Sequence, residues 1–164
     1  MSERLRKLLL AAGLLLLLGG VNYTIWARER LLASGETLLL ELAPVDPRSL
    51  IQGDYMALNF RVAVDLLHGE DPRPSQGKVV LRRAPDGVAA FARLYAGEPL
   101  AADERLLDYR VRDGRVRIVT NAYFFEEGQA ERFVAAHYGE LRVSSSGEGL
   151  LIGVRDAEKQ AIGP

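Results

Sequence analysis

The strongest pattern along the chain is an uninterrupted apolar run near the N-terminus. No charged residue occurs from Leu8 to Ala27, and about twenty such residues are what a helix needs to cross the bilayer core. Tyr23 and Trp26 lie near the far end of the run, where amphipathic rings favour the headgroup level. We therefore predict one N-terminal transmembrane helix that contacts the lipid bilayer over residues 8–27.

The charges on either side of this run set its expected orientation. Arg4, Arg6 and Lys7 precede it, while Arg28 and Arg30 follow it. This small basic excess favours a cytoplasmic N-terminus, with the rest of the chain outside the inner (cytoplasmic) membrane in the periplasm. The expected divisions are residues 1–7 for a cytoplasmic tail, 8–27 for the anchor, 28–36 for a short stalk and 37–164 for an outward-facing domain.

A cleavable signal peptide is the alternative interpretation, because it also has a basic start followed by an apolar run. The run is longer than the roughly 7–15 residues of a signal core. Its exit carries the bulky Ile25 and Trp26 in place of small residues. We expect the segment to remain as an anchor, with the helix continuing to Ser34 and stopping at Gly35, since glycine readily takes the left-handed cap conformation.

The rest of the chain has the pattern of short strands. Residues 37–43 predict a first strand whose Leu38-Leu39-Leu40 run indicates burial on both faces. Residues 55–67 alternate, with Met56 and Phe60 on one side and Tyr55 and Ala63 on the other, which predicts one long strand.

Turn residues then predict three hairpins. Asp-Gly between apolar runs is a strong hairpin signal, because tight turns need positive φ. The expected pairs are 79–83 with 88–95 around Asp86-Gly87, 106–112 with 115–120 around Asp113-Gly114, and 140–143 with 150–154 around 144–149.

A change of period between Glu127 and Gly139 predicts one short amphipathic helix. Ala130, Phe133 and His137 recur at helical spacing, and Gly139 suits the position after the last turn. The predicted fold class is therefore mainly β with one short amphipathic helix, as an antiparallel sheet, a barrel or a sandwich, preceded by the transmembrane helix.

Charge and cysteine content narrow the possible functions. Leaving out Arg4, Arg6, Lys7 and Glu3, residues 8–164 hold 18 basic and 21 acidic residues, a net charge of −3. We therefore expect no basic field for nucleic acid or for anionic lipid, both of which need clustered positive charge. The absence of cysteine excludes disulfides, thiolate zinc sites and thiol catalysis.

The most specified segment is residues 44–60, where Pro44 and Pro47 stiffen a charged loop before a strand. Arg48 is suited to pair with Asp46 or Asp54, or to bind a carboxylate or phosphate of a partner. The structural alternative is that Asp54 caps a turn that Gly53 permits.

The same segment also has a partial likeness to signal peptidases and related serine-lysine proteases, through Leu50-x-x-Gly53-Asp54-x-x-x-Leu58. Val45 stands at about the place of their serine, and Ser49 lies too close to the glycine. Only Lys78 is a plausible base. We interpret this likeness as shared turn architecture rather than protease activity.

Three other groups are candidates for chemistry. Tyr123, Phe124 and Phe125 beside Glu126 and Glu127 form either an aromatic and acidic patch or a strand leading into a helix. His137, on the expected helix face, is read as a core histidine, and a metal site would need it to meet His68. We expect no metal site, and we read Ser144 to Ser146 as a turn.

One family likeness covers nearly the whole chain. The motif Gly53-Asp54-Tyr55-x-x-Leu58-x-Phe60 resembles the signature of the GDYXXLXY family of bacterial membrane-anchored proteins, and the segments 123–130 and 137–143 are similar to it as well. Phe60 replaces the final tyrosine of that signature. The resemblance implies a membrane helix, an outward domain, no cofactor and association with multi-spanning membrane proteins.

Together these observations predict a single-pass accessory module without enzymatic activity, which contacts a multi-spanning membrane protein and no nucleic acid. The alternative is a membrane-tethered hydrolase or glycan-acting enzyme that uses Asp46, Asp54 or Glu127. The candidate contact residues are Asp46, Arg48, Asp54, Tyr55 and Glu127.

Overall fold

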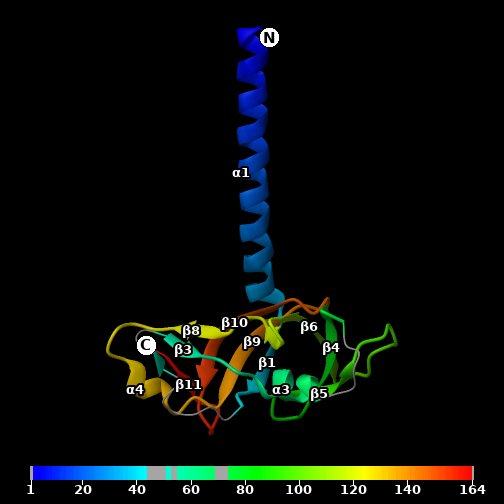
Figure 1. The fold of residues 1–164 in the computed structure, drawn as a ribbon, viewed down its shortest axis with the longest axis vertical. Helices are drawn as coiled ribbons and strands as arrows, with labels where there is room; N and C mark the ends of the chain where they lie inside the picture. The colour runs from blue at the N-terminus through cyan, green and yellow to red at the C-terminus, as the bar shows by residue number, and fades with distance from the viewer. Residues whose placement is uncertain (1, 44–50, 53–54, 69–73, 164) are drawn as a thin grey trace. The chain divides into compact units, whose positions relative to one another are not determined.

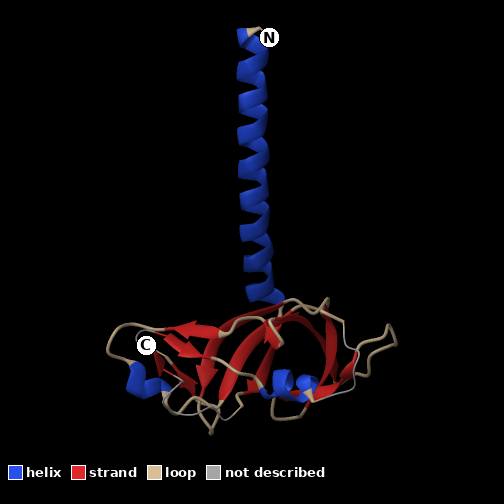
Figure 2. Ribbon diagram, in the orientation of Figure 1, coloured by secondary structure: helices blue, strands red, loops and turns tan. Residues whose placement is uncertain are grey.

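The computed structural model describes residues 2–43, 51–52, 55–68 and 74–163. The chain divides into two compact units, one ending at Ser34 and the other beginning at Gly35. Figure 1 labels most elements of both units, and Figure 2 shows that strands make up most of the second.

The first unit is one long helix, α1 (Glu3–Ser34), of 32 residues. It contains an 18-residue window with a mean hydropathy of 2.0, so its length and composition permit a membrane crossing. The helix extends beyond the apolar run and stops before Gly35, as predicted. Strand β1 begins at once, at Glu36.

The second unit is built on an eight-stranded mixed sheet with the order β11-β10-β9-β1-β5-β4-β6-β7. Its strands are β1 (Glu36–Glu41), β4 (Gln76–Arg83), β5 (Val88–Leu94), β6 (Glu104–Arg112), β7 (Arg115–Ile118), β9 (Tyr138–Val143), β10 (Gly149–Arg155) and β11 (Ala161–Ile162). Three strands separate β9 from β6, yet the Asp108 N–H donates to the Gly147 carbonyl at 2.8 Å. The sheet is therefore strongly curved, but among the described residues it does not close into a barrel.

Strand β1 lies inside this sheet, between β9 and β5. Leu38 and Leu40 are fully buried and Leu39 is nearly so, which confirms the predicted burial on both faces. The expected all-antiparallel arrangement is wrong at one place, because β1 and β5 run parallel, with Leu39 opposite Val88. Turn chemistry specifies neighbours along the chain and carries no information on such a distant pair.

The three predicted hairpins are confirmed. β4 pairs with β5, β6 with β7, and β9 with β10, all antiparallel. Asp113 and Gly114 have φ values of 52° and 70°, the left-handed conformation that a two-residue hairpin turn requires at both positions.

The predicted long strand over residues 55–67 is wrong in its second half. Only β3 (Tyr55–Ala57) is strand, and α3 (Arg61–Leu67) is helical. Val62, Ala63 and Leu66 are buried at a helical spacing. Helix α3 packs against β7, β5 and β1, and Figure 1 shows it beside β5. Both edges of β1 are already paired, so this segment covers the sheet instead of joining it.

The predicted helix from Glu127 to Gly139 is also wrong in extent. Helix α4 (Ala130–Phe133) forms a single turn, with Phe133 buried. His137 follows it in an exposed connection, and Gly139 belongs to β9, opposite Leu40 of β1. Pairing with β1 and β10 holds this part of the chain extended.

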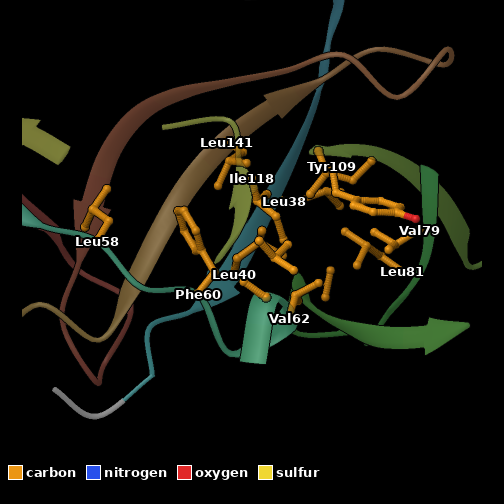
Figure 3. Close-up of a cluster of buried hydrophobic side chains, with 14 of the residues drawn as sticks. Leu38, Leu40, Leu58, Phe60, Val62, Val79, Leu81, Tyr109, Ile118 and Leu141 are labelled. Atoms are coloured by element: carbon orange, nitrogen blue, oxygen red, sulfur yellow. The ribbon is translucent and has the colours of Figure 1, made fainter. Parts of the chain in front are cut away.

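A second, three-stranded antiparallel sheet has the order β2-β3-β8, with β2 (Ile51–Gln52) and β8 (Ala122–Phe124) on either side of β3. The core lies between the curved sheet, α3 and the segment after β3. Figure 3 shows part of this cluster, including Leu38, Leu40, Leu58, Phe60, Tyr109 and Leu141.

Candidate functional site

The described part of the signature motif divides its side chains between two environments. Met56, Leu58 and Phe60 are buried at 2%, 7% and 2% exposure, whereas Tyr55 and Ala57 are only half-buried. This alternation is what strand geometry gives to a segment that covers a core with one face. Of the three motif residues that the structure describes, Leu58 and Phe60 are therefore core residues and Tyr55 is not.

Phe60 joins three parts of the fold. Its backbone pairs with Leu42 beyond β1, and its carbonyl accepts the Ala63 N–H at 2.9 Å as α3 begins. Its ring lies against Gly139 in β9, where a Cβ atom would come within 2.7 Å of the ring Cε1. The glycine is needed for this close approach, not for the helix end that the sequence suggested.

Tyr55 faces away from the core and meets an aromatic partner. It lies directly opposite Phe124 of β8, and the two ring centroids are 5.7 Å apart. Phe124 is 74% exposed. Ala57 and Ala122, two residues further along β3 and β8, form the next pair on the same face, so this face of the small sheet presents uncharged side chains at all four positions.

The aromatic and acidic segment of residues 123–127 forms a strand that leads into a helix, the second of the two interpretations given above. Tyr123 and Phe125 pack on Phe133, at centroid distances of 5.4 Å and 4.6 Å. Glu126 accepts a hydrogen bond from Gln129, and Glu127 is exposed in the turn before α4. The segment thus leads a strand into a short helix, and of its three aromatic rings only that of Phe124 is exposed.

Four of the sequence-predicted residues, Asp46, Arg48, Gly53 and Asp54, lie outside the described residues. A convergence of Asp46 or Asp54 with Glu127, which the hydrolase alternative needs, is therefore not tested.

The two histidines occupy separate exposed positions. His68 ends α3, and its Nδ1 lies 2.8 Å from the Val64 carbonyl. His137 is exposed instead of buried in the core, and its ring is 6.3 Å from that of Tyr138. Within the described ranges, no three side chains of His, Asp or Glu gather as a metal site would require.

Lys78 is engaged in an ion pair. Its Nζ lies 2.5 Å from Asp108 Oδ1 and donates to the Ser146 carbonyl at 2.5 Å. The Ser144 and Ser146 hydroxyls bond to each other at 2.8 Å. Lys78 therefore ties the β9–β10 turn to β6, and the serines form the turn that the sequence indicated.

Comparison with known proteins agrees with the motif. The sequence model of one family, described as GDYXXLXY protein, matches residues 17–154. The chain belongs to the GDYXXLXY family. No curated protein and no solved structure matches it.

The matched region of this GDYXXLXY protein extends from within α1 to β10, so it includes the curved sheet as well as the motif. The structure gives the motif's final aromatic position a packing role in this chain, because Phe60 is buried against Gly139. The ring, retained when phenylalanine replaces tyrosine, is the part that makes this contact.

An ion pair with a buried carboxylate links β5 and β6, the two strands on either side of β4. Glu104 is 5% exposed and accepts two hydrogen bonds from Arg93, at 2.5 Å and 3.1 Å, and one from the Ala101 N–H at 3.1 Å. These bonds, led by that from Arg93, lower the pKa of Glu104 from 4.5 to about 2.

This ion pair predicts an acid-sensitive component of stability. Because the pKa of Glu104 is lower in the folded chain, its stabilisation is present above about pH 4.5 and is lost as the pH falls towards about 2. E104Q should lower the melting temperature at pH 7 by several degrees. It should also flatten the dependence of the melting temperature on pH between about 4.5 and about 2. The measurement is thermal unfolding of the full chain in detergent.

The matched control is E127Q, because Glu127 is exposed and has no hydrogen bond or ion pair among the described residues. It should leave the profile unchanged. An E104Q profile that coincides with that of the E127Q control would contradict the stabilising role of the ion pair.

The net charge of residues 8–164 does not reveal one cluster of basic side chains on the β6–β7 hairpin. Arg110, Arg112, Arg115 and Arg117 are all exposed on the β6–β7 hairpin. Arg110 lies opposite Arg117, and Arg112 lies opposite Arg115. The signal was present in the sequence as Arg-Val-Arg-Asp-Gly-Arg-Val-Arg, since alternation across an Asp-Gly turn puts all four arginines on one face. The expected absence of a basic field is therefore wrong locally.

Proposed function

We propose that this protein is a single-pass protein of the inner (cytoplasmic) membrane and that its β-rich unit, in the periplasm, is an accessory module for a multi-spanning membrane protein. The apolar window of α1 supports the anchor. The Tyr23 and Trp26 rings are 6.0 Å apart, and the Arg30 guanidinium lies 5.3 Å from the Trp26 ring. Such a group suits a membrane–water boundary.

The observation that carries the interaction role is the Tyr55–Phe124 pair. Exposed aromatic rings are enriched at protein interfaces, where they supply large contact area at little entropic cost. Here one ring comes from the family motif, and its neighbours Ala57 and Ala122 on the same face are uncharged. A partner with an apolar surface that can pack against aromatic rings fits this face.

Site-specific crosslinking in cells tests the proposal. A photoreactive residue at Phe124 should capture one multi-spanning membrane protein, identified by mass spectrometry, and Y55A should reduce that capture. The matched control is the same group at Ile152 of β10, which is also exposed, and it should not capture that protein. Equal capture from both positions, or none from Phe124 in a folded chain, would overturn the interface.

Orientation has its own test. A reporter fused at the C-terminus and active only outside the cytoplasm should be active. An inactive reporter on a stably inserted chain would reverse the proposed topology.

A further inference from the structure

The arginines of the β6–β7 hairpin differ from the other described arginines of the β-rich unit. The structure describes twelve arginines in this unit, and the eight outside the hairpin each make a hydrogen bond or ion pair: Arg61, Arg82, Arg83, Arg93, Arg105, Arg132, Arg142 and Arg155. The other four are those of the hairpin, and none of them has a partner among the described residues. Unpaired guanidinium groups are thus concentrated at one place.

Their arrangement is a flat array. Two arginines on each strand are separated by roughly 7 Å along the strand and face the opposite pair at roughly 5 Å. Like charges in directly opposite positions destabilise a sheet. Asp113 is the one acidic residue of the segment 109–118, so the hairpin retains a net charge of +3.

The backbone beneath the array is firmly held. Tyr109, Val116 and Ile118 point the other way and are buried at 2%, 7% and 1% exposure, and β7 packs against α3. The arginines therefore cannot turn inward. The fold presents them outward at a cost in repulsion that an anionic surface would remove.

We propose that this hairpin docks on the anionic phospholipid headgroups of the membrane in which the chain is anchored. This inference rests on the anchoring proposed above. Guanidinium groups match phosphate oxygens in charge and fork geometry. A flat, exposed array fits a layer of many phosphates better than one enclosed ligand. Only Gly35 separates α1 from β1, so a chain anchored by α1 meets headgroup phosphates at a high effective concentration.

The test uses the full chain in lipid vesicles. Since the chain has no cysteine, Q76C gives one labelling site, and Gln76 is exposed and lies opposite Arg110 in β4. An environment-sensitive fluorophore there should report lipid contact in vesicles containing about 30% phosphatidylglycerol, but not in phosphatidylcholine alone. The response should fall at high salt and stay constant from pH 5 to 8, because arginine remains charged.

Two variants of equal charge make the test specific. Each arginine near an anionic surface contributes about fivefold to binding, so R112Q/R115Q should reduce the docking equilibrium about 25-fold. R61Q/R82Q removes two exposed arginines that have acidic partners and should leave docking nearly unchanged. Near-ultraviolet circular dichroism checks that both variants fold.

Several results would overturn the proposal. One is an equal response in both kinds of vesicle, and another is an equal loss in the two double variants. A response to added polyglutamate without a response to phosphatidylglycerol would assign the array to an acidic protein segment. Self-association of R112Q/R115Q with unchanged lipid contact would mean that the arginines instead prevent the edge strand β7 from pairing with another copy of the chain. Alkaline extraction of the same vesicles separately tests whether α1 is anchored.

Discussion

F60A should destabilise the β-rich unit by about 3–5 kcal/mol, the usual loss when a buried phenylalanine is truncated in a core. Total stabilities of about 5–15 kcal/mol make this a large fraction. Phe60 is 2% exposed, its ring contacts Gly139, and its backbone links β1 to the start of α3. The cavity would therefore open where the covering segment meets the sheet.

The measurement is pulse proteolysis of the full chain in detergent across a urea series, which reads the fraction of unfolded β-rich unit. The control is F124A, because the same truncation at a side chain that is 74% exposed should change the free energy of unfolding by less than about 0.5 kcal/mol. Comparable losses in the two variants would contradict the separation of the motif into a buried and an exposed face.

L17R/L18R should remove the chain from the membrane. An arginine near the centre of a spanning helix costs about 2.5–3.5 kcal/mol, and each lost leucine removes a further favourable contribution of about 0.3–0.6 kcal/mol. Both positions lie in the middle of the apolar run, so the total cost is about 6–8 kcal/mol. That cost should reverse an insertion equilibrium that the helix otherwise favours.

The measurement is the fraction of chain that resists alkaline extraction from membranes. L5R/L32R makes the same chemical change outside residues 8–27, where the side chains can reach water, and should leave the chain in the membrane. Retention of L17R/L18R at the control level would mean that α1 does not span the bilayer.

The C-terminal end of α1 and the three hairpins could be predicted because their signals lie in contiguous residues. The apolar run, the stop at Gly35 and the Asp113-Gly114 turn act on neighbouring backbone. The motif was singled out too, and the structure shows that its residues Leu58 and Phe60 pack in the core. Asp54 of the motif and Asp46 and Arg48 of the loop before it lie outside the described residues, and their roles remain predictions.

Residues 61–67 show why the remaining structure could not be predicted. Their alternation suits a strand, and the β-branched Val62 and Val64 favour one locally. The segment becomes α3 because β1 already pairs with β9 and β5, and because Val62, Ala63 and Leu66 can fill the concave face of the sheet. Only the completed sheet contains that information.

By itself, the sequence determined the apolar helix, the mostly β character and the local turns, since propensity and periodicity act over a few residues. The tertiary structure decided the parallel β1–β5 pair, the helical α3 and the contact of Phe60 with Gly139. It also placed four arginines that have no partner among the described residues together on the β6–β7 hairpin of a chain whose overall composition is acidic. These features join segments far apart in the chain, and such contacts depend on which sheet edges and core volumes remain free when the strands pair.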